Sequence, residues 1–129
     1  MLDYRTGSDT DPYRNPITGG YAWTHAHNQF GWRAPKGDYR ANDDRAGHFS
    51  ATLASNLEQL LPAALFVGSL DLFFDESLDH TRRLCAAGVA VDLHSYAGAI
   101  HGFDILSNAA VAQQFEHDLT NAVTHLLAR

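Results

Sequence analysis

The stretch that decides the fold is residues 63–104, AALFVGSLDLFFDESLDHTRRLCAAGVAVDLHSYAGAIHGFD. Its first six residues, Ala63–Gly68, form a continuous apolar run that ends in glycine, a pattern typical of a strand buried on both faces. In residues 89–96, mostly apolar side chains alternate with mostly polar ones, which predicts a second strand with one face more exposed to water. Between the strands, Asp75 and Glu76 predict the start of a helix, because acidic side chains stabilise the positive end of a helix.

Helices are expected after each strand. The first runs from Asp75, its candidate N-cap, to about Ala87, and Gly88 is a suitable residue to end it. The second is a final helix that Ser107 or Asn108 can cap. Its predicted buried stripe comprises Val111, Phe115, Leu119, Ala122, Val123 and Leu126.

The order of these elements is strand, helix, strand, helix. By the usual rule for such crossovers, the two strands lie parallel in one sheet. Upstream of them the sequence predicts one more helical segment, which Pro62 ends. Its leucines at helical spacing are Leu53, Leu57, Leu60 and Leu61. The predicted fold class is therefore α/β, with two parallel strands each followed by a helix.

Residues 1–50 differ in composition from the rest of the chain. They hold only two of the Leu, Ile and Val residues, Leu2 and Ile17, whereas residues 51–129 hold twenty-one. Six basic and six acidic residues cancel in this segment, so the net charge of -6 belongs to residues 51–129. A segment this poor in aliphatic side chains cannot build its own core. We therefore expect residues 1–50 to be a connecting segment, mostly loop, that packs onto a neighbouring body.

The main large apolar side chains of this connecting segment are aromatic, and we treat them as one cluster. It comprises Tyr21, Trp23, Phe30 and Trp32. The cluster either packs the loop onto a neighbouring body or lines a pocket for an apolar substrate group. A helical turn or two would fit between His25 and Trp32, but the apolar positions are too loosely spaced to predict it.

The composition excludes several classes of protein. The chain has 129 residues, of which 45% are hydrophobic and 19% charged, as in an ordinary globular domain. Its excess of acidic residues argues against nucleic acid or an anionic membrane surface as a partner. The single cysteine, Cys85, excludes an internal disulfide and a cysteine-rich zinc site. Neither a bilayer-spanning apolar run nor a signal-peptide core is evident, so a cytoplasmic location is expected.

Two loops follow the carboxyl ends of the predicted strands, where functional groups collect in a parallel sheet. The first loop contains Asp71 and the second contains His101. Because the strands are adjacent, a hydrogen bond between this carboxylate and this imidazole can form. Such a carboxylate fixes the imidazole tautomer and lets the histidine act as general base and then as general acid. Asp75 is an alternative partner for the imidazole, although a role as helix N-cap already accounts for it.

Three motifs occur in order along the second half of the chain. Residues 70–76 read LDLFFDE, residues 83–89 read RLCAAGV, and residues 94–104 read HSYAGAIHGFD. This ordered run resembles the C-terminal part of the α/β-hydrolase esterases of the hormone-sensitive-lipase type. Residues 1–6, MLDYRT, resemble the segment after the sixth strand of that family, and residues 28–32, NQFGW, resemble its link between core and cap.

This resemblance implies a fold, an activity and two site residues. The fold is the C-terminal portion of the α/β-hydrolase fold, with residues 1–50 at the edge of the cap. The activity is hydrolysis of carboxylic esters with small to medium acyl groups through a serine acyl-enzyme, with no metal or organic cofactor. Asp71 matches the acid of the catalytic triad, and His101 matches its base.

The serine nucleophile of that family has no counterpart in this sequence. The family carries it on a G-x-S-x-G turn and has a glycine-rich loop that forms the oxyanion hole. No serine, among them Ser8, Ser50 and Ser69, lies in that pattern. A His–Asp pair without a nucleophile and oxyanion donors cannot form an acyl-enzyme. We therefore expect negligible esterase turnover by the chain alone.

Other candidate residues receive simpler interpretations. His25 and His27 could present two imidazoles to a metal, but no third ligand follows at suitable spacing, so surface histidines and no metal site are expected. Cys85 is expected to be a small buried helix residue. His94 is expected to be half-buried and without a role, and Phe103 either borders the acyl pocket or packs. The histidines expected to face solvent are His80, His117 and His125.

Two functions from different classes follow from these observations. The first is a truncated carboxylic ester hydrolase that keeps the triad acid and base and acts on a small ester once the missing half is supplied. The second is a non-catalytic fragment or interaction protein that pairs with itself or with a complementary half. The apolar strand at residues 63–68 would lack a neighbour on one edge, which favours a homo-oligomer.

Overall fold

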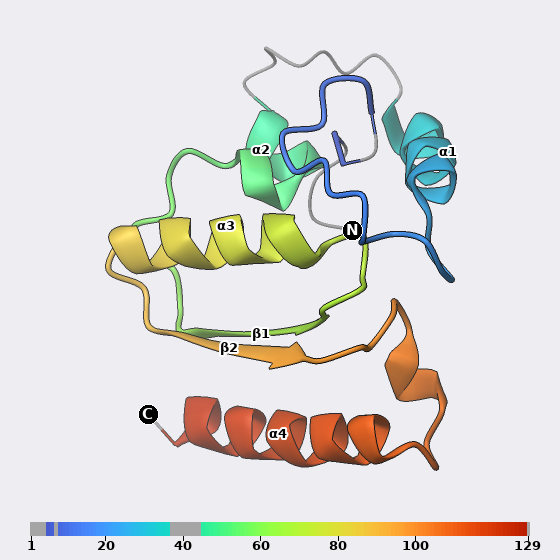
Figure 1. The fold of residues 1–129 in the computed structure, drawn as a ribbon. Helices are drawn as coiled ribbons and strands as arrows, with labels where there is room; N and C mark the ends of the chain where they lie inside the picture. The colour runs from blue at the N-terminus through green and yellow to red at the C-terminus, as the bar shows by residue number, and fades with distance from the viewer. Residues whose placement is uncertain (1–4, 7, 37–44, 129) are drawn as a thin grey trace.

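The computed structural model describes residues 5–6, 8–36 and 45–128. At its centre lies a sheet of two strands, β1 (Ala63–Gly68) and β2 (Val91–Tyr96). The strands run parallel and pair along all 6 residues of each. Helix α3 (Phe74–Ala86) lies on one face of the sheet and helix α4 (Ala110–Leu127) on the other (Figure 1). The predicted α/β fold class, with two parallel strands each followed by a helix, is confirmed.

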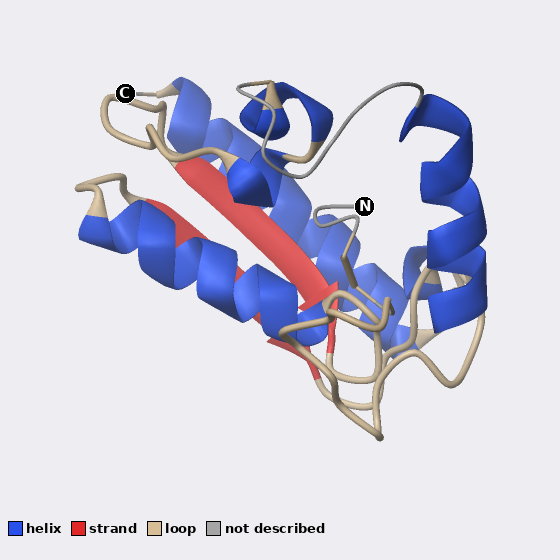
Figure 2. Cartoon of the chain, turned by 90° about the horizontal axis from the view of Figure 1, so that it is seen from above, coloured by secondary structure: helices blue, strands red, loops and turns tan. Residues whose placement is uncertain are grey.

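Four shorter elements complete the described chain: α1 (His25–Lys36), α2 (Ala46–Phe49) and the 3-10 helices η1 (Ala51–Leu53) and η2 (Phe103–Ile105). Helices α1 and α2 lie on the α3 side of the sheet (Figure 1). Many of the loops gather at the end of the sheet toward which the strands point (Figure 2). The carboxyl end of the sheet is therefore where residues from distant parts of the sequence can meet.

Each face of the sheet has its own apolar packing. Leu57, Leu84 and Val89 form a buried cluster, and five partly buried residues pack against it: Ala54, Ala63, Leu65, Ala87 and Val91. On the α4 face, Phe115 makes edge-on contacts with two rings, Phe66 at 5.4 Å and Phe103 at 5.6 Å between centroids. Of the two interpretations of Phe103, the structure therefore supports packing.

The helix expected over residues 53–61 does not form, and this prediction was wrong. Only η1 is helical there, and Leu61 is 84% exposed. The physical reason lies on α3, where the Arg83 guanidinium donates hydrogen bonds to the carbonyl oxygens of Thr52 and Ala54. These carbonyls would otherwise accept the next bonds of an α-helix. Leu57 is buried nonetheless, as a single side chain of an irregular segment.

The predicted caps of the two long helices were also wrong. Phe73 occupies the N-cap position of α3 and Ala109 that of α4, neither with a side-chain hydrogen bond. Asp75 lies within the first turn of α3, near its positive end, and accepts a hydrogen bond from Asn15 Nδ2 at 2.8 Å. Ser107 and Asn108 precede the cap position of α4 and are exposed. The end of α3 is as expected, because Gly88 takes the left-handed conformation, with φ of 82°.

Several burial predictions differ from the structure. In the expected stripe of α4, Leu119 is 38% exposed and Val123 is 46% exposed, whereas Ala122 is buried. The buried position that the stripe missed is Ala112. Cys85 is exposed rather than buried. The α4 face that packs is therefore narrow, with Phe115 between the small buried side chains Ala112 and Ala122.

Some expectations fall on residues that are not described. Residues 1–4 of the resembling segment MLDYRT lie outside the described residues. Within the described part of the chain, no helix is long and apolar enough to cross a membrane. Across the same described residues, no group of three or more His, Cys, Asp or Glu side chains is placed to hold a metal ion.

Candidate active site

Asp71 and His101 lie in the loops that follow β1 and β2, as the sequence predicts. Backbone hydrogen bonds hold the two loops side by side beyond the ends of the strands. Ser69 N donates to Tyr96 O at 2.9 Å, and Leu70 N donates to Ala99 O at 2.9 Å. Gly98 N also donates to the Ser69 hydroxyl at 2.8 Å. These bonds fix the distance between the two loops and hence between the side chains they carry.

Gly68, the last residue of β1, permits this close approach. A Cβ atom at this position would lie 2.3 Å from the carbonyl oxygen of Ala99. Any side chain here would therefore push the second loop away from the first. The glycine that ends the apolar run is thus required by the contact between the two loops, in addition to ending the strand.

The carboxylate of Asp71 and the imidazole of His101 form a hydrogen bond. His101 Nδ1 and Asp71 Oδ2 are 3.0 Å apart. The other carboxylate oxygen, Oδ1, accepts from the backbone N–H of Phe73 at 3.0 Å, so both oxygens are held. The side chain of Asp71 is 11% exposed and that of His101 is 39% exposed. His101 Nε2 has no hydrogen-bond partner among the described residues, so it is available to an incoming group.

Two aromatic rings contact the imidazole of His101. Trp23 lies with its ring centroid 5.8 Å from that of His101, and Phe73 lies at 5.6 Å in an edge-on arrangement. Trp23 belongs to the predicted aromatic cluster, but the four side chains of that cluster do not lie together in the structure. Tyr21 is 65% exposed, Phe30 is 74% exposed, and Trp32 packs on Phe49 of α2. The part of the cluster at the pair is therefore Trp23 alone.

A second polar group lies between β2 and α4. Tyr96 donates a hydrogen bond from its hydroxyl to Asp118 Oδ2 at 2.9 Å, and His94 Nδ1 is 3.7 Å from the same oxygen. Burial, and then the bond to Asp118, raise the pKa of Tyr96 above its usual value. Burial raises the pKa of Asp118, but hydrogen bonds from Tyr96 and Gln114 outweigh burial and lower it overall. His94 is half-buried, as predicted.

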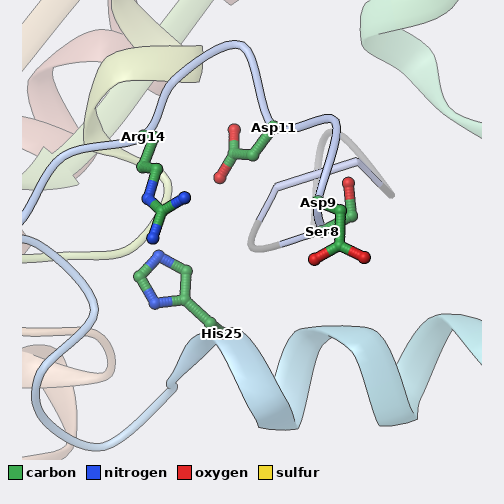
Figure 3. Close-up of a pocket in the computed structure, with 5 residues that line it drawn as sticks. All are labelled: Ser8, Asp9, Asp11, Arg14 and His25. Carbon is green, nitrogen blue, oxygen red and sulfur yellow. The ribbon is translucent and has the colours of Figure 1, made fainter.

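Three hollows in the surface lie away from the Asp71–His101 pair. One of about 250 Å³ is lined by Ser8, Asp9, Asp11, Arg14 and His25. Figure 3 shows the Arg14 guanidinium beside the His25 imidazole, with Ser8 and Asp9 across the hollow. The others, of about 440 Å³ and 450 Å³, lie beside His94 and beside Asp79 respectively. Neither Asp71 nor His101 lines any of these three hollows.

Sequence reasoning missed one buried polar network near the pair. Glu76 in the first turn of α3 is 0% exposed, as is Asn28 of α1, and Thr6 is 1% exposed. In the sequence, Glu76 looks like an acidic residue at the positive end of a helix, where exposure is the usual outcome. Only its partners, 70 positions away in the case of Thr6, show that it is buried.

Comparison with known proteins gives matches of two kinds, to a family and to solved structures. Bacterial heroin esterase aligns with 98% of this chain and 40% of its own, with a TM-score of 0.81 and 24% identity. Esterase LipW from Mycobacterium marinum aligns with 100% of this chain and 39% of its own, with a TM-score of 0.81 and 25% identity. The chain thus spans about two fifths of the length of these two proteins. No curated protein matches the sequence.

The family match covers most of the chain. Residues 1–105, which include both strands and every described element before α4, match the model of the family described as alpha/beta hydrolase fold. The match and the two esterase structures confirm the resemblance inferred from the three motifs. The chain belongs to the alpha/beta hydrolase fold family.

Proposed function

We propose that this chain supplies the acid and the base of a carboxylic ester hydrolase, with Asp71 as the acid and His101 as the base. The observation that carries this proposal is the 3.0 Å hydrogen bond between His101 Nδ1 and Asp71 Oδ2. It is formed by loops at the carboxyl ends of adjacent parallel strands, where the functional groups of such sheets collect. Membership of the alpha/beta hydrolase fold family and likeness to two esterases support the same reaction class.

In this proposal each residue has a separate task. Asp71 accepts a hydrogen bond from the Nδ1–H of His101, which keeps the ring proton on Nδ1 and so leaves Nε2 with its lone pair. Nε2 takes the proton of a serine hydroxyl as its oxygen attacks the ester carbonyl, and the imidazolium then returns that proton to the departing alkoxide. Water releases the acyl group in a second cycle of the same two transfers. The serine and the oxyanion donors come from outside this sequence, which has no G-x-S-x-G motif.

The test is a chimaera in which this chain replaces the matching part of LipW. We expect the chimaera to hydrolyse p-nitrophenyl acetate, and His101→Ala or Asp71→Asn to reduce its kcat by roughly a thousandfold or more. Matched controls are His117→Ala on α4 and Asp104→Asn in η2, both exposed, which should leave kcat unchanged. A folded chimaera whose activity is indifferent to His101→Ala would overturn the proposal.

The chain alone and the chimaera together distinguish the second candidate function from the first. Without a nucleophile it should show no burst of p-nitrophenol from a short-chain ester. A non-catalytic interaction protein predicts the same result for the chain alone, but it also predicts that a correctly folded chimaera is inactive. An initial burst from the isolated chain that His101→Ala abolishes would contradict both alternatives.

A further inference from the structure

Three polar side chains from separate segments meet out of contact with solvent. They are Glu76 of α3, Asn28 of α1 and Thr6 of the connecting segment. The Thr6 hydroxyl donates a hydrogen bond to Glu76 Oε2, and Asn28 Nδ2 donates to the backbone carbonyl of Thr6 at 2.7 Å. This buried network therefore ties the connecting segment and α1 to the helix that begins just after Asp71.

A buried carboxylate is costly unless hydrogen bonds satisfy it, so its position needs a reason. The connecting segment has almost no aliphatic side chains and cannot be anchored mainly by apolar burial. Hydrogen bonds to a carboxylate are stronger than bonds between neutral groups, and they fix direction as well as distance. Glu76 thus provides a buried polar anchor for the connecting segment, in addition to the part-buried bond between Asn15 and Asp75.

The network reaches the candidate active site through Trp23. The indole Nε1 of Trp23 donates to Asn28 Oδ1 at 3.5 Å, and its ring contacts the imidazole of His101. Phe73, the residue before α3, contacts the same imidazole and donates its backbone N–H to Asp71. Both rings that contact His101 are therefore placed by the first turn of α3, one directly and one through the network.

We propose that Glu76 is a positioning residue for His101, acting through Thr6, Asn28 and Trp23. Asp71 holds the imidazole by one nitrogen only, and a single hydrogen bond leaves the ring free to turn about it. Trp23 restricts that rotation only while its indole stays in place. The hydrogen bond to Asn28 holds the indole, and the bond between Glu76 and Thr6 in turn holds the group that Asn28 binds. This inference rests on the proposed function, in which His101 is the base. The placement of the His101 ring is nevertheless tested separately, by a measurement that uses no ester substrate.

The test measures the rate at which diethyl pyrocarbonate modifies His101 in the full chain, followed by mass spectrometry of its peptides. In Glu76→Ala we expect the rate at His101 to rise about twofold or more, because a ring that is 39% exposed becomes more accessible. Glu76→Gln can still accept the Thr6 hydroxyl and should react at the wild-type rate. The exposed His117 is the internal reference and should react equally in all variants.

A structural control separates positioning from general loss of stability. Ser77, the next residue of α3, is 5% exposed and donates its hydroxyl to Phe73 O at 2.7 Å, outside the network. The backbone N–H of Ser77 also donates to Phe73 O, at 3.0 Å, so Phe73 stays held when the hydroxyl is removed. Ser77→Ala should lower the melting temperature yet leave the rate at His101 unchanged. If Glu76→Ala does not fold, Asn28→Ala interrupts the network closer to Trp23 and should give the same rise in rate.

Two results would overturn the positioning role. One is a cooperatively folded Glu76→Ala or Asn28→Ala variant whose His101 reacts at the wild-type rate. The other is an increase in Ser77→Ala equal to that in Glu76→Ala. These rates are measured on this chain without any part of LipW, so they do not depend on whether the chimaera is active. Failure of the proposed function and failure of this inference therefore give different results.

Discussion

At the scale of single residues, His80 on α3 is half-buried, and we expect it to make the fold sensitive to acid. Its Nδ1 is buried with no hydrogen-bond partner among the described residues, and burial lowers the pKa of its imidazole below 6.5. The sequence predicts a solvent-facing histidine here, and that prediction was wrong. Its position on α3 alone does not show that neighbouring segments cover one side of the ring.

His80→Gln should reduce the acid sensitivity of the protein. Protonation of His80 costs more in the folded chain than in the unfolded chain, so stability is lost as pH falls below about 6.5 toward the lowered pKa. The drop in melting temperature between about pH 7.5 and about pH 5 should therefore be smaller in His80→Gln than in the wild type. His117→Gln, at an exposed position, should leave the drop unchanged. An equal drop in the His80 variant would refute this account.

The candidate pair and its surroundings differ in how far the sequence predicts them. Asp71 and His101 could be predicted to meet because loops after adjacent parallel strands share one edge of the sheet. Trp23 was recognised as part of an aromatic group, but nothing in the local pattern placed it against His101. Glu76 could not be recognised as buried, because its burial depends on Thr6, which is distant in the chain. Contacts that follow from the order and pairing of the strands can be predicted from the sequence. Contacts that depend on the path of an irregular segment across the surface cannot.

At the scale of elements, the strands were predicted more accurately than the segment before them. The bounds of β1 agree with the prediction, since a continuous apolar run between Pro62 and Ser69 has few alternatives. The leucine spacing over residues 53–61 is helical, but the carbonyls of Thr52 and Ala54 bind Arg83 instead. A hydrogen bond from a charged group in another element outweighs the local helix propensity. Ordinary residues differ in helix propensity by only a few tenths of a kcal/mol each, up to about 0.7 kcal/mol.

Arg83→Met should therefore release this segment from α3. Methionine keeps the length of the apolar stem but cannot donate to the two carbonyls, which costs about 1–3 kcal/mol in the free energy of unfolding. Hydrogen exchange should show faster exchange of the backbone amides of Leu53 and Ala54, which donate to Ser50 and Ala51. Arg82→Met is the matched control, because Arg82 is exposed and binds Asp79 of its own helix. Equal destabilisation by both substitutions would contradict the role of Arg83.

At the scale of the whole molecule, β1 has an unpaired edge. The amides of Ala63 and Ser69 donate toward β2 and its neighbours, so those of Ala64 and Phe66 point to the opposite side. No strand pairs with that side within the described residues. Exposed apolar side chains add to the tendency to associate; the largest exposed fractions are those of Leu61, Leu127, Ile105 and Phe30.

We predict that the chain associates with itself through this edge. Light scattering after size-exclusion chromatography should give a mass above the 14.2 kDa of one chain. Ala64→Pro removes an outward amide without breaking the β1–β2 ladder, so it should lower that mass and leave the melt cooperative. Leu65→Pro removes an amide that points toward β2 and should unfold the sheet instead. A wild-type chain that is monomeric with a sharp melt would contradict this prediction.

The hydrogen bond between Asp71 and His101 spans only 30 positions of the sequence. Helix α3 and strand β2 occupy much of the intervening segment, so the formation of these elements itself brings the two loops together. These two residues can therefore come together as soon as β1, α3 and β2 assemble, without waiting for the rest of the chain. In the proposed function, the acid and the base therefore come from one continuous stretch of chain, and a nucleophile from any other segment would meet a hydrogen-bonded Asp–His pair that has already formed.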